Sequence, residues 1–138
     1  NGAAHPIIMG SYGIGVERVL ACFLEQSHDE NGIVWKGELS PFNFHIVGLN
    51  TKKESVADAC EKIYNDLSAN GYEVLYDDRT NVQAGFKFND ADLLGMPVQI
   101  IVGDKTLAEN SVELKIRATG ERYKVTLNEL YEKLSELI

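Results

Sequence analysis

Phe42-Asn-Phe-His-Ile-Val-Gly-Leu49 is followed within a few residues by a helical pattern, and that succession decides the fold class. The run 42–49 is almost continuously apolar, which is typical of a strand whose two faces are both covered. Across 56–67 apolar residues recur at helical spacing, and Thr51-x-x-Glu54 ahead of them has the pattern of a capping box. A strand that leads directly into a helix predicts an α/β domain.

The same alternation continues to the end of the chain. We expect strands at 72–76 and 98–102, a helix at 84–94 ended by Gly95, a hairpin of 112–117 with 122–125, and a last helix opened by a capping box at Thr126-x-x-Glu129. This order, βαβαβββα, predicts an α/β fold with a mixed β-sheet of about five strands flanked by three helices.

The first 40 residues differ in character. Pro6-Ile-Ile-Met9 predicts a short buried strand, a glycine-rich turn follows, and 16–26 has helical spacing. The stretch 27–41 is polar and rich in turn residues, which makes it the best linker candidate. We therefore expect a strand-turn-helix piece over 1–40 and a complete domain over 41–138. A natural protein seldom begins beside a core strand, so this pattern indicates a fragment, with its first strand disordered or paired with another copy.

Composition excludes several classes of protein. The 138 residues are 44% hydrophobic and 25% charged, as in a folded globular domain. Two cysteines are too few for a disulfide framework, and no apolar run approaches the roughly 18 residues of a membrane span, so we expect a cytoplasmic protein. With 13 basic and 21 acidic residues the net charge is −8, which excludes broad coating of nucleic acid through counterion release. Residues 105–124 alone hold five cations and three acids. This local balance is compatible with a domain that binds a few unstacked bases.

The glycine-rich turn has the spacing Gly13-x-Gly15-x-x-Arg18. Glycines at a helix start let backbone amides approach a phosphate, and a guanidinium on the first helical turn can clamp it. The fit to a dinucleotide-binding fingerprint is poor, because Arg18 stands where that fingerprint has its third glycine. On spacing alone, a tight strand-to-helix turn explains the glycines equally well.

Met9-Gly-Ser-Tyr-Gly-Ile-Gly-Val-Glu-Arg18 resembles the third class-defining motif of class II aminoacyl-tRNA synthetases, above all in its bacterial-type prolyl version. Stretches 28–35 and 40–42 continue that match. The resemblance implies that Gly13 and Gly15 belong to the wall of the ATP pocket and that Arg18 contacts the ATP phosphates. Ser11 and Lys36 depart from the family, which commonly has cysteine and proline there.

Later stretches resemble, in the right order, the anticodon-binding domain of the same enzymes, a fold shared with the threonyl, histidyl and glycyl synthetases. These stretches are 77–79, 85–88, 91–97, 102–105 and 113–117. Along the last of them alternate residues point to opposite faces, so Glu113, Lys115 and Arg117 share the face away from the core. Arg122 and Lys124 alternate in the same way across the hairpin, so up to four cations line one face if the register permits.

Charges that alternate along a hairpin usually mark a solvated sheet face. The resemblance instead implies contacts to the guanines of a proline anticodon, since Lys or Arg can donate to guanine O6 and N7 while a carboxylate accepts from N1 and N2 hydrogens. The implied tRNA anticodon-binding residues are Arg79, Lys87, Lys105, Glu113, Lys115 and Arg117. We expect Arg79, Lys87 and Lys105 at strand ends or in loops. Arg79 has the alternative of pairing with Asp77 or Asp78, and Phe86 and Phe88 either stack on bases or belong to the core.

The resemblance implies a parent enzyme that joins proline to tRNA(Pro) with ATP and Mg²⁺ and works as a homodimer. The chain alone should be inactive, because the rest of a class II active site does not fit ahead of residue 10. We expect no tightly bound cofactor and no metal site in it. The alternatives are the domain of another class II synthetase (threonyl, histidyl or glycyl), a non-catalytic accessory protein with the same domain, and a small-molecule-binding α/β domain with an accidental motif.

Overall fold

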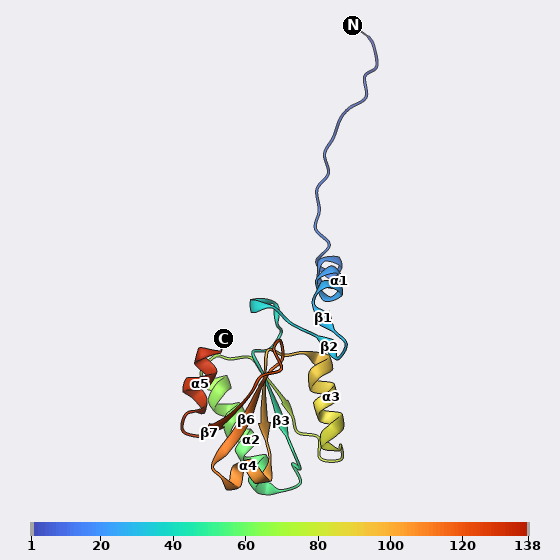
Figure 1. Ribbon diagram of the computed structural model, residues 1–138. Coiled ribbons are helices and arrows are strands. Elements are labelled where there is room, and N and C mark those ends of the chain that lie inside the picture. The colour runs from blue at the N-terminus through green and yellow to red at the C-terminus, as the bar shows by residue number, and fades with distance from the viewer. Residues whose placement is uncertain (1, 138) are drawn as a thin grey trace.

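The computed structural model describes residues 2–137, and its centre is a five-stranded mixed sheet in the order β4-β3-β5-β6-β7 (Figure 1). The strands β3, β4 and β5 run parallel, and β6 and β7 add an antiparallel hairpin to β5. Their bounds are β3 Phe44–Gly48, β4 Val74–Asp77, β5 Val98–Val102, β6 Ser111–Ile116 and β7 Arg122–Thr126. The predicted fold class, strand number and mixed pairing are confirmed.

Helices cover the two faces of the sheet unequally (Figure 1). The helices α2 (Glu54–Ala69), α4 (Asp104–Ala108) and α5 (Leu130–Glu136) pack on one face and enclose the larger core. Of the helices within residues 2–137, α3 (Ala84–Leu94) alone packs on the other face, over a small cluster of Val47, Ala91 and Ile101. The short α4 comes in addition to the three expected helices, because five residues are too few to show a helical period. No helix within residues 2–137 is long and apolar enough to cross a membrane.

Both predicted capping boxes are wrong, although a helix follows each of them. The Thr51 hydroxyl donates to the backbone oxygens of Asp78 and Arg79 instead, and α2 begins after Lys53. At the other site the Thr126 hydroxyl donates to the Glu129 carboxylate at 2.8 Å, and α5 begins only at Leu130. A threonine followed by a glutamate thus marked the region of each helix start but not its boundary.

The predicted buried strand at 6–9 is wrong. Ile7, Ile8 and Met9 are exposed by 91%, 98% and 83%, and the chain from 2 to 15 has no regular secondary structure. No strand within residues 2–137 pairs with this stretch, and without a neighbour its backbone groups cannot form a sheet. The helix that follows, α1 (Val16–Gln26), confirms the predicted one (Figure 1).

The polar stretch 27–41 contains more structure than a linker needs. It forms a small antiparallel hairpin, β1 (His28–Asp29) with β2 (Gly32–Ile33), and a 3₁₀ turn, η1 (Gly37–Leu39). In Figure 1 the hairpin lies against the carboxyl end of α3, and β2 packs on that helix. The segment between the two predicted units is therefore docked on the sheet domain.

Candidate nucleic-acid interface

The face of the sheet that carries α3 also carries the predicted row of charges. Across the strands Gln99 lies opposite Lys115 and Lys115 opposite Arg122, while Glu113 lies opposite Lys124. The neighbours of these residues along β6, Val112 and Leu114, are fully buried in the core on the other face. The alternation predicted for the hairpin is confirmed, and its register brings the charges together.

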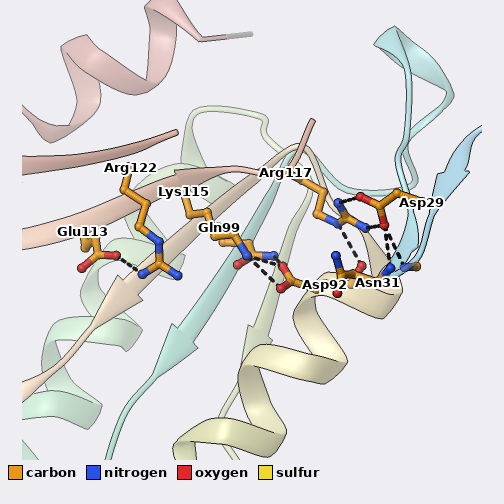
Figure 2. A network of polar contacts seen from close by, with 9 residues as sticks. Asp29, Asn31, Asp92, Gln99, Glu113, Lys115, Arg117 and Arg122 are labelled. Carbon is orange, nitrogen blue, oxygen red and sulfur yellow. Dashed lines mark hydrogen bonds and ion pairs between the residues drawn. The ribbon is translucent and has the colours of Figure 1, made fainter. Parts of the chain in front are cut away.

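Asp92, on α3, organises the centre of this face (Figure 2). The Lys115 ammonium lies 2.6 Å and 2.8 Å from the two carboxylate oxygens, and the Gln99 amide donates to the first at 2.8 Å. Burial alone would raise the pKa of Asp92, but the hydrogen bonds from Lys115 and Gln99 outweigh it, so the pKa is lowered. Asp92 therefore stays ionised and fixes the Lys115 ammonium in place. We call Asp92, Gln99, Lys115, Arg117 and Asp29 the Asp92 cluster.

Asp92 had no assigned role in the sequence analysis. Its stretch, 91–97, carried the family resemblance, but nothing local shows that an acid on a helix will meet a lysine 23 positions later. The pairing follows from topology, because α3 crosses the sheet on the face to which Lys115 points.

Arg117 lies on the predicted face but is buried, with its side chain only 5% exposed. Its Nε donates to the Asp92 backbone oxygen at 2.9 Å, and its two terminal nitrogens donate to the two oxygens of Asp29 at 2.7 Å each. The hydrogen bond from Arg117 holds the pKa of Asp29 far below its ordinary value. Arg117 is thus covered by Asp29 and α3, although it lies on the predicted face.

Beside this centre the face is open. The Arg122 guanidinium, 52% exposed, pairs with Glu113, and Lys124, 54% exposed, pairs with Glu109. Exposed pairs of this kind contribute about 0–1 kcal/mol, so these side chains can exchange their partners for a ligand at little cost. Figure 2 shows Glu113, Lys115 and Arg122 side by side on the strands.

A hollow of about 290 Å³ adjoins Glu113 at the carboxyl ends of β3 and β5. The chain leaves β3 toward β4 and β5 toward β6, which is the arrangement at which open α/β sheets bind ligands. Lys105, on α4, brings a cation to the rim, and Phe88 forms part of the apolar wall. Lys105 was expected at a strand end or in a loop; it lies in the short helix α4, which begins just after β5, and its side chain is exposed.

A second charged group lies at the carboxyl end of β4, and we call Asp77, Arg79, Lys87 and Asp90 the Asp77 cluster. Arg79 donates to both oxygens of Asp77, at 2.9 Å and 2.8 Å, and to Asp90 at 2.7 Å. Of the two partners proposed for Arg79, the structure has Asp77. Burial would raise the pKa of Asp77, but the hydrogen bonds from Arg79 lower it below its ordinary value.

Lys87 does not lie at a strand end or in a loop, so that prediction is wrong. It lies within α3 with its side chain 1% exposed, and its ammonium donates to the backbone oxygens of Gly48 at 2.8 Å and Asp77 at 3.2 Å. This lysine joins α3 to the ends of two strands, and it is covered on every side. Its neighbour Phe86 is 63% exposed, whereas Phe88 packs on the small core cluster.

The predicted ATP-site residues lie far from this face along the chain. Gly15 is the N-cap of α1, Arg18 is in its first turn, and Gly13 precedes the helix. All three are exposed, and Arg18 forms no ion pair within residues 2–137. Within the described residues, Gly15 and Arg18 therefore lie at the start of one exposed helix, and their role at an ATP site stays a prediction.

Comparison with known proteins identifies the domain. The family model described as the anticodon binding domain matches residues 43–137. The chain is 48% identical to the proline–tRNA ligase of Bacillus subtilis over 136 residues, 51% identical to that of Listeria innocua over 134, and 44% identical to that of Bacillus licheniformis over all 138. These alignments cover 97–100% of this chain, which spans about a quarter of the length of each relative, 23–24%. By the match over most of its length, the chain belongs to the anticodon binding domain family.

Proposed function

We propose that residues 41–138 read the anticodon of a proline tRNA for a proline–tRNA ligase, and that residues 1–40 are the end of its catalytic domain. One observation carries the proposal: on the α3 side of the β6–β7 hairpin a lysine that is 14% exposed and fixed by Asp92 lies beside a carboxylate and an arginine. The relatives, named proline–tRNA ligases, support the choice of proline.

Guanine is the base that this set of groups suits. Lys115 would donate to O6 and N7, and Glu113 would accept from the N1 and N2 hydrogens once Arg122 releases it. Adenine and the pyrimidines do not offer both halves of that pattern together. Because Asp92 already holds Lys115, little conformational entropy is lost when a base binds.

The remaining proposed contacts differ in kind. Lys105, at the rim of the hollow, would bind a phosphate or a base edge, and Arg79, 45% exposed, would do the same at the end of β4. Phe86 offers an exposed ring on which an unstacked base can lie. Lys87 and Arg117 are buried, so their proposed role is to hold Asp77, Asp92 and α3 in position and not to touch RNA.

For the whole enzyme we propose tRNA(Pro), proline and ATP with Mg²⁺ as its substrates and metal, a homodimer as its assembly and the cytoplasm as its location. Arg18 would contact the ATP phosphates, and Gly13 and Gly15 would let the backbone come close to the nucleotide. Residues 2–137 contain no group of three or more His, Cys, Asp or Glu side chains that could hold a metal ion.

The proposal is tested by titrating the chain with two anticodon stem-loops, one with a proline anticodon and one with its guanines replaced. We expect Lys115→Ala to weaken binding of the first by about 1–3 kcal/mol and to reduce the preference for it over the second. Lys62→Ala is the matched control, because Lys62 is exposed on α2, across the sheet from the proposed site.

Equal binding of the two stem-loops by the unchanged protein would overturn the anticodon assignment. If Lys115→Ala prefers the proline stem-loop as strongly as the unchanged protein does, the role of Lys115 alone is overturned. The base contact would then be assigned to Lys105 and the hollow beside it.

A further inference from the structure

We infer that Asp29 and Arg117 form a latch that fixes α1, with Arg18 on it, in one orientation relative to the anticodon-reading face. The latch is inferred from the contacts between Asp29 and Arg117. Its role in anticodon reading rests on the proposed function. Both members are positioning residues: neither would touch RNA or ATP.

Asp29 holds two structures at once. One carboxylate oxygen accepts the backbone N–H groups of Asn31 at 2.8 Å and Gly32 at 3.1 Å, which closes the turn between β1 and β2. The same carboxylate accepts both terminal nitrogens of Arg117, 88 residues away. A planar guanidinium bonded at two points fixes angle as well as distance, so the hairpin is held in a defined orientation (Figure 2).

Arg117 is itself anchored in the sheet domain. Its backbone N–H donates to the Pro97 oxygen at 2.9 Å, and its Nε donates to the Asp92 oxygen at 2.9 Å. The charged pair therefore connects the hairpin to the carboxyl end of α3 through a side chain that cannot swing away.

Two glycines permit a close approach beneath this pair. A Cβ on Gly32 would lie 2.3 Å from the Leu93 Cα, and one on Gly95 would lie 1.9 Å from the Ile33 oxygen. Gly95 also has φ of +75°, the left-handed conformation that ends α3. The backbone of β2 is thus in direct contact with the backbone at the end of α3. Such close packing indicates that the hairpin is fixed to α3 and is not a flexible linker.

The joint extends into α1 through Trp35. The Trp35 ring stacks on Phe23 of α1 with centroids 5.6 Å apart, and its N–H donates to the Leu94 oxygen at 2.9 Å. The Val34 N–H donates to the oxygen of Ser27, the residue that follows α1, at 2.8 Å. A continuous set of contacts thus joins α1 to the hairpin and the hairpin to α3.

Asp92 is where this set meets the proposed reading site. Its backbone oxygen accepts from Arg117, and its carboxylate holds Lys115. Displacement of the hairpin would move the last turn of α3. The Asp92 carboxylate, which holds Lys115, would move with it. By linkage, a base bound to Lys115 must in turn favour the latched orientation.

The test uses Cys22, an exposed thiol on α1, whereas Cys60 is buried. A nitroxide on Cys22 broadens the amide NMR signals of residues near α1. Asp29→Asn keeps an oxygen for the hairpin turn but removes the charged pair, and Glu30→Gln makes the same change of charge on the neighbouring exposed residue. We expect broadening at 92–96 to fall at least two-fold in Asp29→Asn and to stay unchanged in Glu30→Gln, with the signals of β3 and β5 unshifted in both.

Arg117→Lys tests the geometry, because a single ammonium keeps the charge but cannot make the paired contact. It should resemble Asp29→Asn, and the double variant should be no worse than either single one. Equal broadening in Asp29→Asn and Glu30→Gln would overturn the latch.

Stem-loop titration of the same samples separates the two proposals. We expect Asp29→Asn to bind the proline stem-loop several-fold more weakly than Glu30→Gln does. Equal binding by the two would overturn the coupling. If the unchanged protein discriminates no anticodon, the proposed function fails, yet the broadening experiment still decides the latch.

Discussion

The two charged clusters on α3 are built alike but differ in what they face. Each centres on an aspartate whose pKa is lowered. The Asp77 carboxylate pairs with both a lysine and an arginine, whereas the Asp92 carboxylate pairs with Lys115 while Arg117 donates to the Asp92 backbone oxygen and pairs with Asp29. In the Asp77 cluster the lysine is buried and the arginine is 45% exposed, whereas in the Asp92 cluster the arginine is buried and the lysine is 14% exposed.

The difference shows that α3 contributes to stability through Lys87 and to the proposed RNA-binding face through Asp92. The Lys87 ammonium donates to backbone oxygens at the ends of two strands. Its loss therefore leaves the buried oxygens of Gly48 and Asp77 without this donor. Lys115 is 14% exposed and is held by a side-chain carboxylate that also accepts from Gln99, so its loss leaves no backbone oxygen of the strands without a donor. We therefore expect the two lysines to affect different measurements.

Lys87→Ala should have the largest effect on folding. Removal of one partner of a buried charged contact costs about 3–5 kcal/mol, because the remaining groups stay buried and unpaired. Urea unfolding followed by circular dichroism measures it. Lys62→Ala, on an exposed position of α2, should stay within about 0.5 kcal/mol. A loss below about 1 kcal/mol for Lys87→Ala would mean that the two clusters do not differ in the way described.

Gly95→Ala should come next and tests the docked joint beside the Asp92 cluster. The left-handed conformation costs a side chain about 1–2 kcal/mol, and the clash with the Ile33 oxygen adds about 1–3 kcal/mol. Gly71→Ala is the matched control, since Gly71 also follows a helix with positive φ but has open space where a Cβ would lie. The difference between the two variants in unfolding free energy isolates the clash. Equal losses would show that the hairpin is not packed on α3.

Acid should weaken both clusters. A carboxylate whose pKa is below its ordinary value of 3.8 in the folded protein stabilises it fully above that value, and this contribution is lost as the pH falls through the folded pKa. Unfolding free energy should therefore fall as the pH drops below about 4, and it should fall less steeply in Asp92→Asn. Asp58→Asn is the control, because Asp58 is exposed on α2 and forms no ion pair within residues 2–137. Parallel curves for all three proteins would contradict the role of Asp92.

The sequence was sufficient for the features that depend on local patterns. Alternation along 112–117 predicted the two faces of β6, and Gly95 predicted the end of α3. It was insufficient where partners lie far apart in the chain, as with Asp29 and Arg117. It also failed for the apolar stretch 6–9, because no neighbouring strand within the described residues is present to pair with it and cover it. Lys87 shows a further limit, because the helical pattern around it did not reveal which side of the helix would be covered.

Arg122→Ala should have the smallest effect on stability and so gives the sharpest contrast with Lys87→Ala. Its exposed pair with Glu113 contributes at most about 1 kcal/mol, so the unfolding curve should move only slightly. Binding behaves differently, because the arginine lies beside Lys115 across the hairpin and its charge attracts the RNA backbone. We expect stem-loop affinity to fall several-fold and its salt dependence to become shallower. Loss of stability without loss of binding would place Arg122 with the Asp77 cluster as a structural residue and would remove the β6–β7 face from the proposed site.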